Sequence, residues 1–125
     1  MRSATLLLIA ALLGGATAGP AADKDDSLDR AIADRTPGAT VDCVDRAWVH
    51  GPTVIDQRTL AYRDGRTLWI NRLPDACPSL DDKVIMVSEA TGSRICRGDA
   101  FRTVEPYGSI ASGVCRLGAF TPYRR

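Results

Sequence analysis

The dipeptide Asp64-Gly65 constrains the fold of this chain most, because it separates two runs rich in β-forming residues. A two-residue type I′ turn needs φ > 0 at both central residues, and Asp-Gly meets that need well. We therefore predict a hairpin over 59–73 with Leu60 opposite Trp69. Its apolar side chains divide between two faces: Leu60, Tyr62 and Trp69 on one, and Ala61, Leu68 and Ile70 on the other. A hairpin apolar on both faces needs a cover on both.

The first 18 residues have the three parts of a secretory signal peptide. Arg2 supplies the positive charge, residues 4–13 form the apolar segment, and Ala16-Thr17-Ala18 is a small-residue cleavage site. An apolar segment of about ten residues is too short for a bilayer, which needs roughly twenty. We expect cleavage after Ala18 and a periplasmic or secreted mature protein, with no membrane attachment after cleavage.

The mature chain divides into a polar leader over 19–39 and a single β domain over 40–125. Without Arg2, 15 Lys and Arg residues balance 15 Asp and Glu residues, which gives no electrostatic footprint for nucleic acid. In the leader, Ser27 could cap a short helix whose narrow apolar face is formed by Leu28, Ala31 and Ile32. The alternative is a disordered leader.

Short apolar runs separated by turn residues continue to the end of the chain, and no long helix pattern interrupts them. We predict strands over 40–50, 53–55, 83–88, 94–96, 101–104 and 114–120, with Pro122 ending the last one. The fold class is therefore all-β: a small antiparallel meander that closes into a barrel or a tight sandwich. Strands that are neighbours in sequence should mostly be neighbours in the sheet.

Four cysteines lie in the exported part, which predicts a disulfide framework in an oxidising compartment. Three pairings are open, and we favour Cys77–Cys96 with Cys43–Cys115, the second closing the barrel. Zinc is the alternative, but no C-x₂₋₄-C pair exists and His50 is the only histidine. The sequence thus predicts disulfides, no metal and no cofactor.

No catalytic motif stands out, because a single histidine and no Gly-x-Ser-x-Gly elbow leave no nucleophile arrangement. A binding face is the better hypothesis, built from an aromatic surface, a neutral donor and a forked cation. The residues that we expect to form it are Trp48, His50, Arg72 and Tyr107. Arg72 could instead simply pair with Asp99 or with another nearby carboxylate.

Several short motifs after Cys43 resemble a group of small exported proteobacterial proteins of unknown function with a four-cysteine framework. The motifs are Val54-Ile55-Asp56-x-x-Thr59-Leu60, Trp69-Ile70-Asn71-Arg72-Leu73, Cys77-x-x-Leu80, Ile95-Cys96-x-x-Asp99 and Cys115-x-Leu117-Gly118. The resemblance implies a periplasmic or secreted location and assigns no catalytic residue.

The sequence therefore favours a non-catalytic binding or structural module of the bacterial periplasm with a protein or saccharide partner. The alternative is an inhibitor of an extracytoplasmic hydrolase, which would present a rigid loop to the enzyme cleft. The most plausible loop for that purpose runs from Glu105 to Gly113.

Overall fold

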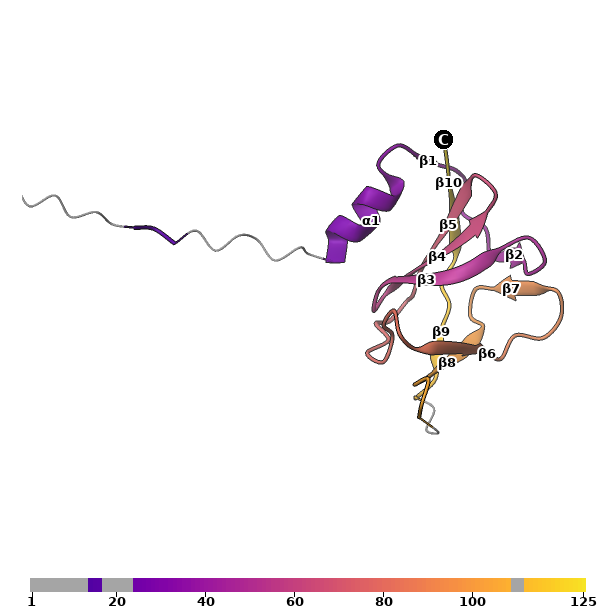
Figure 1. The fold of residues 1–125 in the computed structure, drawn as a ribbon. Coiled ribbons are helices and arrows are strands. Elements are labelled where there is room, and N and C mark those ends of the chain that lie inside the picture. Colours follow the sequence, from indigo (N-terminus) through magenta and orange to yellow (C-terminus); the bar gives the residue numbers. More distant parts are fainter. Residues whose placement is uncertain (1–13, 17–23, 109–111) are drawn as a thin grey trace, which may run out of the picture.

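The computed structural model describes residues 14–16, 24–108 and 112–125, and almost all of the predicted signal peptide lies outside these ranges. One helix and ten strands follow one another along the chain (Figure 1). The elements are α1 (Lys24–Ile32), β1 (Thr36–Pro37), β2 (Cys43–Asp45), β3 (His50–Asp56), β4 (Thr59–Asp64), β5 (Thr67–Arg72), β6 (Ile85–Ser88), β7 (Arg94–Cys96), β8 (Ala100–Val104), β9 (Cys115–Arg116) and β10 (Phe120–Arg124). The structure is thus mostly β, as predicted.

The predicted hairpin is present as β4 and β5, but its turn lies one residue further along the chain. Leu60 is opposite Asn71 and Tyr62 is opposite Trp69, so the predicted pairing of Leu60 with Trp69 is wrong. Gly65 occupies the first turn position with φ of 54°, and no described non-glycine residue has positive φ. This is the pattern of a type II′ turn, which needs glycine only at its first central position.

The predicted division of the hairpin into two apolar faces is confirmed, because a register shift of two residues leaves every side chain on its face. Ala61, Leu68 and Ile70 pack together under Leu28 of α1. Helix α1 therefore covers one face of the sheet (Figure 1). It begins at Lys24, so Ser27 lies inside the helix and not at its N-cap.

The central sheet has five antiparallel strands in the order β1-β10-β5-β4-β3. Two smaller sheets, β2-β7 and β6-β8-β9, lie against the face that α1 leaves free. The core between them contains the following buried apolar side chains: Val44, Leu60, Tyr62, Leu73, Cys77, Leu80, Ile95, Phe101, Leu117 and Phe120. Because the central sheet ends at β1 and β3, it is open, and the predicted closed barrel is not formed.

Several of the predicted strands are wrong in extent or in pairing. The strand predicted over 53–55 is β3, which runs from His50 through Gly51-Pro52 to Asp56. The strand over 40–50 is interrupted by a turn at 46–48, and only Cys43–Asp45 belongs to β2. The strand over 94–96 is β7, but it pairs with β2, while β6 pairs with β8. Pro122 does not end the last strand but lies inside β10, opposite Trp69. The expectation that sequence neighbours pair therefore holds for β3, β4 and β5 and for β8 with β9, and it fails for β6 with β7.

Two disulfides are present, but the predicted pairing is wrong. Cys43 pairs with Cys96 across the β2-β7 ladder, and Cys77 pairs with Cys115. The prediction failed because it assumed that Cys43 and Cys115 lie on strands that close a barrel. In the open fold, each bridge instead fastens a part of the smaller sheets that has few ladder hydrogen bonds.

Asn71 connects the central sheet to the segment after β9. Its fully buried side chain donates a hydrogen bond to the Gly118 carbonyl oxygen and accepts one from the Gly118 amide, both at 2.8 Å. A Cβ atom at position 118 would overlap the Arg72 carbonyl oxygen. Only glycine therefore fits at position 118.

Candidate functional site

A groove runs between β3, an edge strand of the central sheet, and β6, an edge strand of the three-stranded sheet. We call it the β3–β6 groove. Its inner part encloses about 290 Å³ and its outer part about 420 Å³, and the two parts share Gly51, Pro52 and Met86. In the described part of the chain, both strands pair on one side only. The groove walls are therefore two sheet edges.

The inner part of the groove is mainly apolar. Its lining comes from five strands, from the turn before β3 and from the segment after β9, and consists of Arg46, Val49, Gly51, Pro52, Tyr62, Met86, Ser88, Ile95, Phe101 and Leu117. Strand alternation explains why β6 contributes Met86 and Ser88, whereas Ile85 and Val87 lie on its exposed face. Such a lining favours binding of an apolar group of a ligand, with polar contacts restricted to the rim of the groove.

Tyr62 lies on the floor of the inner part and is 3% exposed. Its ring packs edge-on against Phe120, with 5.7 Å between the ring centroids. Its hydroxyl forms no hydrogen bond within the described residues, and burial raises the pKa of this hydroxyl well above the usual range for tyrosine. The hydroxyl is thus a neutral group without a protein partner, and it can donate a hydrogen bond to a ligand in the groove.

The outer part of the groove has an acidic end formed by the Asp81-Asp82 pair. The Asp81 carboxylate stabilises the turn that follows it, because its Oδ1 accepts hydrogen bonds from the amides of Lys83 and Val84 at 2.7 and 3.1 Å. This agrees with the behaviour of an Asx turn. Asp82 is exposed and leaves a carboxylate at the mouth of the groove.

Gly51 shapes the wall where the two parts of the groove meet. Its φ is 119°, and a Cβ atom there would lie 3.1 Å from the Ala61 carbonyl oxygen and 3.2 Å from the Thr53 amide nitrogen. A side chain at this position would be strained as well as crowded. The pairing of β3 with β4 shifts register between His50 and Thr53, around Gly51, and again between Val54 and Asp56, as is common in edge strands.

The residues of the predicted binding face are not brought together as one surface. Trp48 and His50 are exposed beside the start of β3, and His50 is paired with Arg63. Arg72 is paired with Thr59 at the other end of β4, four residues away and so about 13 Å along the strand. Tyr107 is fully exposed in the segment between β8 and β9.

Arg72 does not pair with Asp99, which was the simpler alternative. Asp99 accepts a hydrogen bond from the Cys96 amide at 2.7 Å instead. Arg72 lines a separate cavity of about 400 Å³ together with Arg97 and Arg116. In that cavity Arg97 lies 3.9 Å from the Asp42 carboxylate, and Arg116 donates to the Gly98 carbonyl oxygen.

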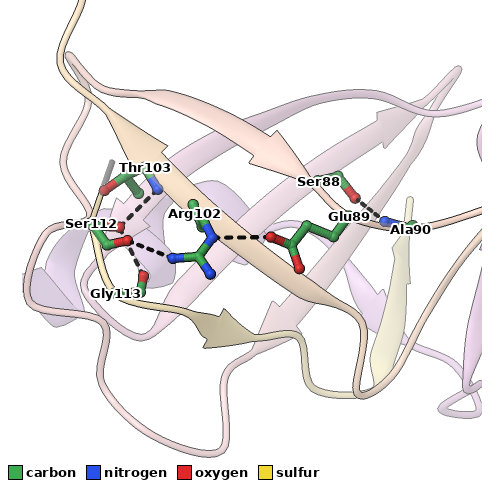
Figure 2. A network of polar contacts seen from close by, with 7 residues as sticks. All are labelled: Ser88, Glu89, Ala90, Arg102, Thr103, Ser112 and Gly113. Carbon is green, nitrogen blue, oxygen red and sulfur yellow. Dashed lines mark hydrogen bonds and ion pairs between the residues drawn. The ribbon is translucent and has the colours of Figure 1, made fainter. Parts of the chain in front are cut away.

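The segment proposed as an inhibitory loop, Glu105 to Gly113, includes residues 109–111, which lie outside the described residues. Its C-terminal end is fixed to β8, as Figure 2 shows. Arg102 donates hydrogen bonds to Glu89 and to the Ser112 carbonyl oxygen, and the Thr103 amide donates to the Ser112 hydroxyl. This polar network lies on the exposed face of the three-stranded sheet, away from the groove.

Within residues 14–16, 24–108 and 112–125, no group of three or more potential ligands could hold a metal ion, and no helix is long and apolar enough to cross a membrane. Comparison of the chain with protein-family models, curated proteins and solved structures finds no match. The likeness to small exported proteobacterial proteins therefore stays a prediction. The two disulfides indicate a compartment outside the cytoplasm.

Sequence reasoning missed the groove because its residues come from distant segments. Gly51 and Pro52 were visible only as a break in a strand, and Met86 only as one member of an apolar run. The signal that could have found the groove is the alternation within β6, where Met86 and Ser88 share a face opposite to Ile85 and Val87.

Proposed function

We propose that this chain is a non-catalytic binding module of the periplasm or of another extracytoplasmic compartment, and that the β3–β6 groove is its binding site. The observation that carries the proposal is the inner part of the groove, where the nearly buried Tyr62 lies among apolar side chains and its hydroxyl has no hydrogen-bond partner among the described residues. A site of this kind takes one apolar group and orients it through a few polar contacts.

A protein partner fits this groove better than a saccharide. Most of the inner lining is aliphatic or aromatic, whereas a sugar would need many more hydrogen-bonding groups around it. The two walls are also edge strands whose outer main-chain groups have no partner among the described strands. An extended segment can use such groups for main-chain hydrogen bonds while one side chain enters the pocket.

The extracytoplasmic location rests on the two disulfides and on the signal-like sequence before Gly19. Inhibition of an extracytoplasmic hydrolase is the alternative. It needs the Glu105–Gly113 segment to be the binding element, and substitutions in the groove would then leave inhibition unchanged.

The experiment is selection of binding peptides from a displayed library of random dodecapeptides, followed by titration of the selected peptide into variants of the chain. Ser88→Phe fills the inner part of the groove and should weaken binding at least about tenfold. Ser88→Ala removes the same hydroxyl but keeps the space open, and should bind within about twofold of the parent.

Val87→Phe is the matched control, because it introduces the same ring on the opposite face of β6. It should also bind within about twofold of the parent. Circular dichroism and a thermal melt check that every variant is folded. The proposal fails if no peptide is selected, or if folded Ser88→Phe binds as the parent does.

A further inference from the structure

Four arginine side chains surround one cavity at the turn end of the β4-β5 hairpin. The cavity measures about 390 Å³, and its lining consists of Arg35, Arg63, Gly65, Arg66 and Arg125. These residues come from the loop after α1, from β4, from the β4-β5 turn and from the position just after β10. We call this site the arginine cavity.

The sheet places Arg63 and Arg125 on one face, the face that α1 covers. Arg63 lies two residues after Ala61 in β4, and Arg125 lies two residues after Tyr123 of β10. Strand alternation therefore puts the two members of each pair on the same side of the sheet. The helix ends at Ile32, which leaves the hairpin end of this face uncovered. The β3–β6 groove lies on the opposite side of the sheet, so the two sites are independent.

Arg35 is held in place by main-chain carbonyl groups. Its Nη1 atom donates to the carbonyl oxygens of Arg66 at 2.6 Å and Tyr123 at 3.4 Å. Its buried Nε atom has no hydrogen-bond partner among the described residues. The guanidinium group is therefore positioned before any ligand arrives, and this arrangement lowers the entropic cost of binding.

Carboxylates neutralise little of this charge. Arg125 pairs with Asp34 at 2.8 Å, and both side chains are mostly exposed. Neither Arg63 nor Arg66 makes a side-chain hydrogen bond or ion pair with the described residues. Like charges gathered in this way repel one another, and an anion placed between them would remove the repulsion.

We propose that the arginine cavity binds a compound or headgroup carrying a phosphomonoester or a diphosphate. Guanidinium groups match phosphate oxygens with paired N–H donors, and several of them around one cavity favour a ligand with more than one negative charge. The phosphate can belong to a soluble molecule or to the headgroup of a lipid, and the experiment separates these sources.

The experiment titrates inorganic pyrophosphate into the purified chain by calorimetry at fixed ionic strength. The parent should show saturable one-to-one binding. The double variant Arg63→Gln, Arg66→Gln should weaken it at least about tenfold, since each tenfold loss needs only about 1.4 kcal/mol. The matched control, Arg72→Gln with Arg97→Gln, removes the same charge from the other arginine-lined cavity and should bind within about twofold of the parent.

Co-sedimentation with phosphatidylcholine vesicles, with and without phosphatidic acid, forms the second arm. Binding to phosphatidic acid vesicles that pyrophosphate reverses would assign a lipid headgroup, whereas pyrophosphate binding alone would assign a soluble ligand. Absence of binding in both arms overturns the proposal. Equal weakening by the two folded double variants also overturns it, because the effect would then come from net charge alone.

Discussion

The central sheet and the two smaller sheets of this protein are stabilised in different ways. Strands β3, β4, β5 and β10 have five to seven residues each, and the sheet they form is covered on both faces by apolar side chains. Strands β2, β7 and β9 have only two or three residues, and each contains a disulfide-bonded cysteine. Burial dominates in the first region, and covalent links compensate for short ladders in the second.

This comparison shows where a small chain needs cross-links. A body of this size buries a limited apolar surface, and the long hairpin uses much of it. The remaining strands can still form an ordered wall for the groove, because the two disulfides covalently hold the ends of the intervening loops together. The following predictions test this difference, in order of decreasing effect.

Removal of both disulfides, through Cys→Ala substitution at all four positions, should have the largest effect. On the chain-entropy description, loops of 53 and 38 residues contribute about 4 kcal/mol each. Hydrogen exchange measured by mass spectrometry should show loss of protection in β2, β7 and β9 before β4 and β5. Equal loss throughout the chain would contradict the comparison.

Phe120→Ala should lower the free energy of unfolding by about 3–5 kcal/mol, because a fully buried ring in contact with Tyr62 leaves a cavity. Urea denaturation measures this change. Val114→Ala, at a residue 46% exposed, is the control and should change stability by less than about 0.5 kcal/mol. Similar losses for both variants would refute the importance of the core between the sheets.

Asn71→Leu should lower stability by about 1–3 kcal/mol, because it leaves the Gly118 amide and carbonyl groups buried without partners. Asn71 joins the two regions, so the exchange rate of the Gly118 amide should rise even when the β4-β5 hairpin stays protected. An unchanged rate at Gly118 would show that the junction does not depend on this side chain.

Arg102→Gln should have the smallest effect, less than about 1 kcal/mol. The side chains of Arg102 and Glu89 are 40% and 49% exposed, so water screens their ion pair (Figure 2). Thermal melting provides the measurement. A fall comparable to that of Phe120→Ala would mean that the smaller sheets depend on polar contacts and not on their disulfides.

The sequence predicts the central hairpin well because the information is local. Alternation of apolar residues sets which side chains share a face of the hairpin. This division is correct even though the turn is centred on Gly65-Arg66 and not on Asp64-Gly65. The face of α1 was predicted for the same reason, since Leu28, Ala31 and Ile32 recur at helical spacing.

The pairing of distant segments could not be predicted in this way. Whether Cys43 meets Cys96 or Cys115 depends on which strands become neighbours, and the short strands carry too little pattern to decide that. The expectation that sequence neighbours pair predicts β7 beside β6. In the structure, β7 pairs with β2 and β6 pairs with β8. The groove and the arginine cavity both arise from such distant pairings, so they were seen only in the structure.

Methionine methyl spectroscopy tests the central claim, binding in the β3–β6 groove, most directly. The chain has two methionines, Met1 in the predicted signal peptide and Met86, which lines both parts of the groove. With ¹³C-methyl-labelled methionine, titration of the selected peptide should shift the Met86 signal saturably, with the dissociation constant found by direct binding. Saturation of the protein by the peptide without any change in the Met86 signal would contradict the account.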